Sequence, residues 1–430
     1  MKIIYKNNLN AKEYAALLKR PAIDNTNVMS VIKPVLDEIK TGGLKAVLKY
    51  ASKFDGLNSD QIKLGPEEIS RGADLLESCV REAIDTAYEN ILSFHLKQKP
   101  AGYEMETMPG IRCSREYRAI ESVGLYIPGG TAVLPSTMLM LGIPAKIAGC
   151  ERTVVCSPSK NGSVSPALLY AAQKCGITEF YRIGGAQAVG MLAYGTEETG
   201  KVDKIFGPGN QYVTAAKSLV SIDPDGCAID MPAGPSEVLI IADRTGIPGF
   251  IASDLLSQAE HGKDSQAVLV TTDEKLAGEV VLEIDKQIAN LERIEFANAA
   301  ISNSFILIAD DINQAIDFSN SYAPEHLILS IADYNDQKNK IRNAGSVFLG
   351  NYSPESAGDY ASGTNHSLPT YGYAKSFSGV NVESFMKAVT FQELSAEGLK
   401  GISGTVVRLA ETESLQAHAN AVKIRIENGN

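Results

Sequence analysis

Hydrophobic and polar positions follow two patterns along the chain: a helical one near both ends and a mixed one between them. From Pro66 to Lys97, apolar residues recur every three or four positions, which predicts an amphipathic helix. Residues 1–100 are expected to be mostly helical. From about residue 121, short apolar runs alternate with helical patterns, and nine of these runs are expected to be strands: Val123–Ile127, Thr153–Cys156, Phe180–Ile183, Val202–Phe206, Val238–Ala242, Ala267–Thr271, Phe305–Ile308, His326–Ser330 and Ser346–Leu349.

This alternation favours an α/β protein built from βαβ units, in which helices cover both faces of parallel sheets. Nine strands are many for one sheet, so we expect two sheets in two domains. After about residue 383 the pattern is helical again as far as Asn430. The 430 residues are ample for a large buried core.

Composition and charge narrow the classes of function. Forty basic and 51 acidic residues give a net charge of −11 with no basic block, which disfavours nucleic-acid binding. The uncharged stretch from Ser122 to Ala145 is not expected to span a membrane, because prolines and glycines interrupt it. No C-x-x-C pair occurs among six cysteines, and no signal peptide is visible, so reduced thiols in the cytoplasm are expected.

Three glycine clusters follow predicted strands, although the G-x-G-x-x-G and P-loop fingerprints of nucleotide-binding proteins do not occur in the sequence. Ligands of parallel α/β proteins lie at the carboxyl ends of strands, where glycine lets the backbone approach a phosphate. The alternative is that the clusters are only tight turns. They are Ile127–Gly130, Ile183–Gln187 and Phe206–Asn210.

Histidines and carboxylates offer candidate chemistry. Gln258 and His261 are spaced so that a helix would carry both on one face, and Asp359 and His418 would add to a mixed N/O ligand set suited to zinc. Scattered surface polar groups are the alternative. Glu325-His326 opens a predicted strand. A histidine can take an alcohol proton and an adjacent carboxylate can activate water, while the alternative is a capping glutamate beside a half-buried histidine.

Long segments of the chain resemble the histidinol dehydrogenase family, over nearly the whole length. The first 100 residues carry the resemblance least clearly. The segments that carry it are Val123–Cys150, Ile183–Gln187, Gly207–Tyr212, Ile229–Asp243, Asp254–Gly262, Tyr322–Leu327 and Glu355–Gly379.

The resemblance implies a four-electron oxidation of L-histidinol to L-histidine, with two NAD molecules and a bound aldehyde intermediate, as the last step of histidine biosynthesis. His326 would be the general base and Glu325 would activate water. One Zn²⁺ per subunit would orient the substrate. The implied ligand and contact residues are Gln258, His261, Asp359 and His418 for the metal, Ser236, His366 and Glu413 for the substrate, and Tyr126, Gln187 and Asn210 for NAD.

The family's fold implies two related, incomplete Rossmann-like domains of the aldehyde-dehydrogenase type, one inserted in the other. The expected division is a helical N-terminal tail (1–25), a first domain (26–128 plus 236–381), an inserted nucleotide domain (129–235) and a C-terminal helical tail (382–430). The family is a homodimer whose tail reaches the partner's site. Glu413 and His418 would therefore serve the neighbouring subunit.

Four alternatives stay open. A relative of the family would oxidise another small polar alcohol to its acid. A thiol mechanism would use Cys150 or Cys156 as nucleophile. A zinc hydrolase would leave the NAD-contact positions unexplained, and a non-catalytic NAD- or metal-binding module would leave Glu325-His326 unexplained.

Overall fold

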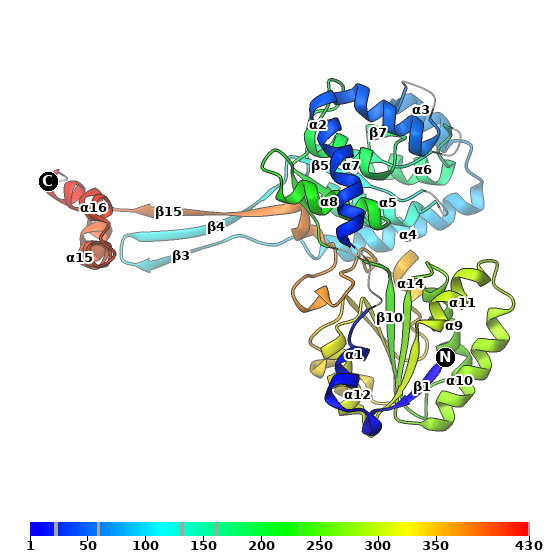
Figure 1. Cartoon of the computed structure of the whole chain (residues 1–430). Coiled ribbons are helices and arrows are strands. Elements are labelled where there is room, and N and C mark those ends of the chain that lie inside the picture. Colours follow the sequence, from blue (N-terminus) through cyan, green and yellow to red (C-terminus); the bar gives the residue numbers. More distant parts are fainter. Residues whose placement is uncertain (21–24, 58–60, 130–132, 160–161, 233, 429–430) are drawn as a thin grey trace.

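The computed structural model describes residues 1–20, 25–57, 61–129, 133–159, 162–232 and 234–428. These residues form two α/β units, each built on a six-stranded sheet, and an arm that projects from them (Figure 1).

The first sheet is parallel throughout, in the order β1-β12-β11-β10-β13-β14. Every residue of β10 and β11 is buried, as expected for central parallel strands that are covered on both faces. The strands are β1 (Lys2–Tyr5), β10 (Glu237–Ala242), β11 (Gln266–Thr271), β12 (Phe305–Ile308), β13 (His326–Ser330) and β14 (Ser346–Leu349).

Alternate residues of these strands feed two separate cores. Val238 and Ile240 pack with α9, α10 and α11 on one face, whereas Leu239 and Ile241 pack with α12 and the N-terminal helix α1 on the other. The helices of this unit are α1 (Ala11–Leu17), α9 (Pro248–Ala259), α10 (Glu274–Ile288), α11 (Ile294–Ser302), α12 (Ile312–Tyr322), α13 (Tyr334–Gln337) and α14 (Glu355–Tyr360).

The second sheet has the order β2-β7-β6-β5-β8-β9, with β2 antiparallel and the remaining pairs parallel. One face is covered by α2, α7 and α8, and the other by α3, α4, α5 and α6. The strands are β2 (Lys63–Leu64), β5 (Ser122–Tyr126), β6 (Arg152–Cys156), β7 (Glu179–Tyr181), β8 (Lys204–Phe206) and β9 (Ala228–Ile229).

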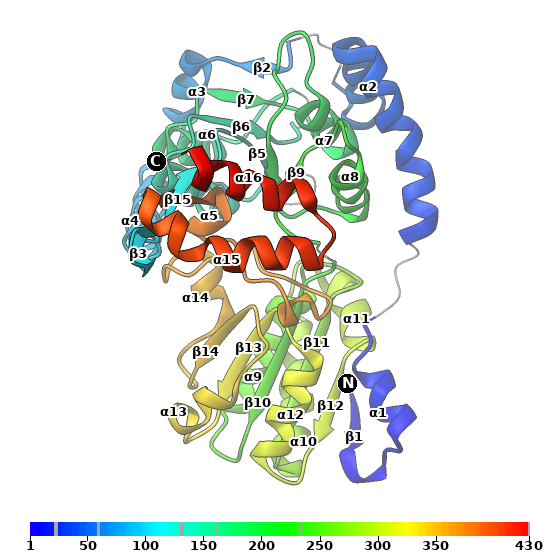
Figure 2. The same cartoon turned by 90° about the vertical axis from the view of Figure 1, so that its left-hand side faces the viewer.

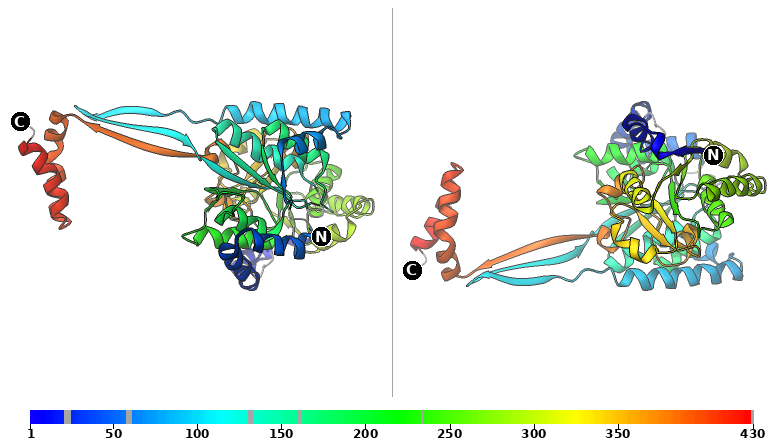
Figure 3. Two further views of the ribbon diagram at one scale, coloured as in Figure 1. Left: turned by 90° about the horizontal axis from the view of Figure 1, so that it is seen from above. Right: turned by 90° about the horizontal axis from the view of Figure 1, so that it is seen from below.

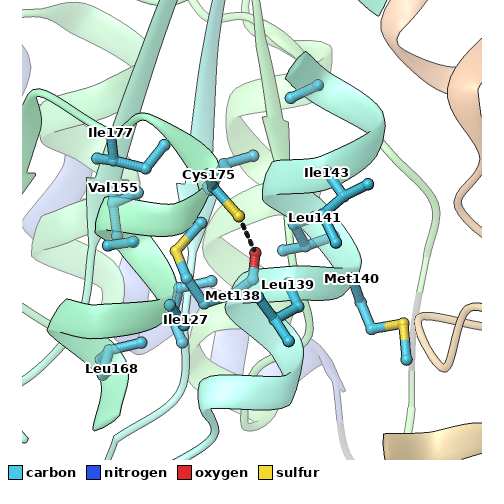
Figure 4. Close-up of a cluster of buried hydrophobic side chains, with 14 of the residues drawn as sticks. Ile127, Met138, Leu139, Met140, Leu141, Ile143, Val155, Leu168, Cys175 and Ile177 are labelled. Atoms are coloured by element: carbon cyan, nitrogen blue, oxygen red, sulfur yellow. Dashed lines mark hydrogen bonds between the residues drawn. The ribbon is translucent and has the colours of Figure 1, made fainter. Parts of the chain in front are cut away.

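The helices of this second unit are α2 (Asn25–Asp55), α3 (Pro66–Ala73), α4 (Ser78–Leu96), α5 (Pro135–Ala148), α6 (Pro166–Cys175), α7 (Gly185–Tyr194) and α8 (Gln211–Ile222). Figure 4 shows the core between α5 and α6, where the Cys175 thiol lies 3.8 Å from the Met138 carbonyl oxygen. Nearly all residues of α5 are buried.

A three-stranded antiparallel arm carries the C-terminal helices away from both sheets (Figures 1 and 3). It consists of β3 (Tyr103–Met108), β4 (Ile111–Ala119) and β15 (Met386–Leu394). Helices α15 (Ala396–Thr412) and α16 (Gln416–Asn428) pack on each other at its end and lie in front of the second unit in Figure 2. Four short 3₁₀ segments complete the described structure: Lys6–Asn8, Lys338–Lys340, Tyr373–Lys375 and Val382–Phe385.

The α/β class, the nine strands and the two sheets are confirmed. The helical pattern over Pro66–Lys97 is confirmed, although it forms two helices, since α3 ends at Ala73 and α4 begins at Ser78. The fully helical tail after residue 382 is wrong, since β15 pairs along nine residues with β4. β15 and β3 are mostly exposed, so no apolar alternation marked them as strands.

The expected division into domains does not match the sheets. β5, which was assigned to the first domain with residues 26–128, pairs with β6 and β8 of the second sheet. The N-terminal segment is not only helical, because β1 forms the edge of the first sheet beside β12. The chain therefore leaves the first sheet after β1, builds the second unit and the first arm strands, and returns at β10. Among the described residues, no helix is long and apolar enough to cross a membrane.

Candidate functional site

The Glu325-His326 pair lies at the amino-terminal edge of the first sheet. His326 is the first residue of β13 and pairs with Val238 of β10. Glu325 and His326 are both nearly fully buried, with 5% and 4% exposure. The interpretation of a half-buried histidine at a strand start is therefore wrong, because the ring is enclosed.

The backbone of Glu237, the first residue of β10, holds both side chains. Its N–H donates to Glu325 Oε2 over 2.9 Å, and its carbonyl oxygen lies 3.2 Å from His326 Nδ1. Since a carbonyl only accepts, Nδ1 carries the proton of this hydrogen bond. His326 Nε2 has no hydrogen-bond partner in the described structure and lies 3.4 Å from Asp359 Oδ1. The ring thus directs its second nitrogen toward Asp359.

Buried carboxyl groups control the titration of His326. Burial lowers its pKa, but the charges of Glu325, Asp359 and Glu355 outweigh this effect and raise it to about 10. Burial raises the pKa of Glu325 and of Glu355 to about 8 each. Groups with such perturbed pKa values cluster at functional sites.

Gln258 and His261 lie at the end of α9, next to this cluster. Both amide atoms of Gln258 are buried and have no partner among the described residues. Burial of the ring lowers the pKa of His261, although the residue keeps exposed surface. The charge of Asp359 raises this pKa, and that of His326 lowers it. A buried amide without a hydrogen-bond partner costs free energy unless a ligand or ion completes it. An amide oxygen, an imidazole and a carboxylate are together suited to a zinc-like cation.

These side chains do not complete a metal centre within one chain. Across the described ranges, no three His, Cys, Asp or Glu side chains gather as a metal-binding group. The predicted set of Gln258, His261 and Asp359 offers three donors in one chain, one fewer than a tetrahedral zinc site requires.

His366 links the two units at this site. Its Nδ1 lies 2.8 Å from the Asp359 carbonyl oxygen, and its Nε2 lies 3.0 Å from the Thr137 hydroxyl at the start of α5. Ser236 directly precedes Glu237 and is partly exposed. The structure thus brings Ser236 and His366 to the edge that holds His326.

Glu413 and His418 lie elsewhere. Glu413 follows the last residue of α15 and His418 lies in α16, and both are exposed at the end of the arm (Figures 1 and 3). The structure of one chain does not join them to the site.

The predicted NAD-contact residues lie at the carboxyl edge of the second sheet. Tyr126 ends β5, and its hydroxyl accepts a hydrogen bond from the Gly185 N–H over 3.1 Å. Gln187 lies in the first turn of α7 and donates to Asp55. Asn210 caps α8 by accepting from the N–H groups of Tyr212 and Val213. All three polar groups therefore already have protein partners.

The three glycine clusters also lie at this edge, after β5, β7 and β8. Gly207 has a φ of 122°, and a Cβ there would meet the Tyr126 carbonyl oxygen at 2.1 Å. Only glycine allows that close passage of the two strand ends. Gly130 of the first cluster lies outside the described residues.

Sequence reasoning missed four groups that the structure places beside the predicted site. Glu355 accepts from Ser257 over 2.8 Å, and its second oxygen has no partner in the described structure. Burial raises the pKa of Asp254 to about 7. Glu237 opens an apolar strand, which is a signal that the sequence offered, and Arg20 ion-pairs with it from a distant segment.

The thiol alternative is opposed by the environment of both cysteines. Burial raises the pKa of Cys150 to about 11 and that of Cys156 still further. A thiolate is the nucleophilic form, so neither thiol is activated in this structure.

Comparisons with known proteins match one family over nearly the whole chain. The family model described as "Histidinol dehydrogenase" matches residues 18–426. Histidinol dehydrogenases from Vibrio parahaemolyticus and Bacteroides thetaiotaomicron are 50% and 49% identical, covering 99% and 96% of this chain and 99% and 97% of their own. The crystal structure of histidinol dehydrogenase from Elizabethkingia anophelis superposes with a TM-score of 0.94 at 47% identity, covering 99% of this chain and 98% of its own.

Proposed function

Because this chain belongs to the histidinol dehydrogenase family of oxidoreductases, we propose that it oxidises L-histidinol to L-histidine through a bound aldehyde, with two NAD molecules reduced. The observation that carries the proposal is the buried Nε2 of His326, which has no hydrogen-bond partner in the described structure and faces the Asp359 carboxylate, while Glu325 lies beside Nδ1. Such a nitrogen is suited to accept a proton from an alcohol.

His326 and Glu325 divide the chemistry. His326 Nε2 takes the hydroxyl proton of the alcohol while a hydride leaves the same carbon for NAD. Glu325 then takes a proton from the water that adds to the aldehyde, and the protonated His326 returns its proton to the aldehyde oxygen, giving a hydrate and a neutral His326. His326 removes a proton from the hydrate as the second hydride leaves. The balance is one alcohol, one water and two NAD consumed, with one acid, two NADH and two protons formed.

Gln258, His261 and Asp359 would hold the metal from this chain, with His418 of a second chain as a further ligand. When bound, Zn²⁺ supplies a positive charge that orients the amine and imidazole of the substrate. The orphaned Gln258 amide is the feature of this chain that fits such an ion. Ser236, His366 and Glu413 would contact the substrate.

NAD would lie along the carboxyl edge of the second sheet, contacted by Tyr126, Gln187 and Asn210. The helix ends and close backbone turns at this edge suit a phosphate-bearing ligand. The Thr137–His366 hydrogen bond joins the unit that carries this edge to the His326 site, which supports a dinucleotide bound between them.

The active form would be a homodimer with shared sites, in which the arm presents Glu413 and His418 to the other subunit. The support is that both residues are exposed at the arm's end while the ligand set of one chain is incomplete. A cytoplasmic location stays a prediction from the reduced-thiol pattern.

The purified protein should be assayed with L-histidinol and excess NAD, counting NADH formed per substrate consumed. Two NADH and free histidine support the proposal. One NADH with released aldehyde contradicts the role of Glu325. Absence of NADH from zinc-loaded protein contradicts the substrate assignment and favours a related small polar alcohol.

A further inference from the structure

A buried ion pair lies directly behind the Glu325-His326 pair. Arg20 Nε donates to Glu237 Oε2 over 2.6 Å, and its Nη2 donates to Oε1 over 2.7 Å. The two side chains are only 6% and 1% exposed. A bidentate pair of this kind fixes position as well as charge.

The backbone of the same Glu237 binds both catalytic side chains, through its N–H to Glu325 and its carbonyl to His326. Arg20 therefore fixes the side chain of the residue whose main chain orients the acid-base pair.

Arg20 also holds the segment that leads into the pair. Its Nη2 donates to the Ala323 carbonyl over 3.2 Å, and its guanidinium stacks on the Tyr322 ring at 3.5 Å. Ala323 has a φ of 55°, an uncommon left-handed conformation that needs support from its surroundings. Only Pro324 separates it from Glu325. The Arg20 guanidinium thus contacts both the first residue of β10 and the segment that leads into β13.

The N-terminal segment is anchored so that Arg20 reaches this place. β1 pairs with β12, and α1 packs on α12 through an edge-to-face contact of Tyr14 with Phe318. Arg20 follows α1 and lies 217 residues from Glu237 in sequence. These contacts give the N-terminal segment a defined position relative to the active edge.

We propose that Arg20 is a positioning residue for this reaction, which acts through Glu237 to hold Glu325 and His326 in their working geometry. The inference rests on the proposed function, because it assigns Arg20 to that acid-base pair. A misplacement of about 1 Å costs about 100-fold in rate in well-positioned sites. We therefore expect Arg20→Ala to lower kcat by about 10- to 100-fold and to leave KM for histidinol within about threefold.

The chain offers a matched control. Arg152 binds Glu179 with the same two-pronged geometry, over 2.8 and 3.0 Å, at the amino edge of the second sheet. Arg152→Ala removes an ion pair of the same geometry, with side chains 26% and 23% exposed, from the other sheet. It should lower Tm without changing kcat in protein that remains folded.

The experiment compares both variants and the wild type well below their Tm values, and adds guanidinium chloride at millimolar concentration to each. Guanidinium should restore kcat of Arg20→Ala alone, because it can refill the site between Glu237 and Ala323. Unchanged kcat in Arg20→Ala, or an equal loss in Arg152→Ala, would overturn the proposal.

Arg20→Ala leaves Glu237 buried and unpaired, and so could prevent folding. The double variant Arg20→Met, Glu237→Gln removes both charges and keeps the volume filled. It should fold and still show the reduced kcat, whereas full activity would overturn the inference. If the wild type itself yields no NADH from histidinol, the proposed function fails rather than the positioning role.

Discussion

The candidate residues of the two six-stranded sheets lie at opposite edges, and their polar groups are satisfied differently. At the carboxyl edge of the second sheet, Tyr126, Gln187 and Asn210 all have hydrogen-bond partners within the chain. At the amino edge of the first sheet, the Gln258 amide and His326 Nε2 are buried without one in the described structure.

This difference suggests separate roles for the two edges: cofactor binding at the second sheet and proton transfer at the first. Turns and helix ends that already satisfy each other make a rigid surface for a cofactor of fixed shape. Buried groups that lack partners are costly unless something else completes them. We infer that substrate, metal and a second chain complete the first edge, and that substitutions at the two edges should affect different kinetic constants.

The largest effect is expected from His326→Asn. Removing the proton acceptor should lower kcat by about 1,000-fold for both alcohol and aldehyde oxidation. Stopped-flow measurement of each half-reaction tests this expectation. Retention of either half-reaction would assign the base elsewhere.

Glu325→Gln should divide the two steps. The amide cannot take a proton from water, so oxidation of added aldehyde should fall by about 100-fold and alcohol oxidation by clearly less. Separate assays with histidinol and with the aldehyde measure the two losses. Equal losses would contradict the division of labour.

Asn210→Ala tests the other edge. Loss of the cap of α8 should cost about 1 kcal/mol of stability, and KM for NAD should rise about tenfold with kcat nearly unchanged. Asp273→Ala is the matched control, because Asp273 caps α10 by accepting from the Leu276 N–H. A similar rise in KM for the control would show that the effect is only lost stability.

The smallest effect is expected on the pH dependence of kcat. The raised pKa of His326 means that the neutral ring, and therefore kcat, should increase with pH up to about 10. Glu355→Gln removes a negative charge that stabilises the imidazolium, so the rising limb should move to lower pH by about one unit. Glu283→Gln, at a partly exposed carboxylate on α10, should leave the profile unchanged. A shift to higher pH in Glu355→Gln would refute the electrostatic account.

The sequence was most informative where local pattern and structure coincide. Buried parallel strands such as β10 and β11 are continuous apolar runs, and glycine clusters mark the strand ends that backbones must pass closely. Glu325-His326 was also recognisable, because a charged dipeptide opens an apolar strand.

Contacts between segments that are distant in sequence could not be predicted from local pattern. The pairing of Arg20 with Glu237 joins segments that local pattern cannot relate. The arm strands expose both faces, so no period marks them, and β5 joins the second sheet only through its partners β6 and β8. Which edge of a sheet faces a ligand depends on how the two units pack.

The most direct test of the account mixes two inactive variants, His326→Asn and His418→Ala, by unfolding and refolding them together with zinc. Half of randomly formed dimers pair one chain of each kind, and a shared site would be intact once in each of them. About a quarter of wild-type activity should therefore return. If no activity returns while each variant refolds as a dimer, the site is completed within a single chain, and the proposed role of the arm is wrong.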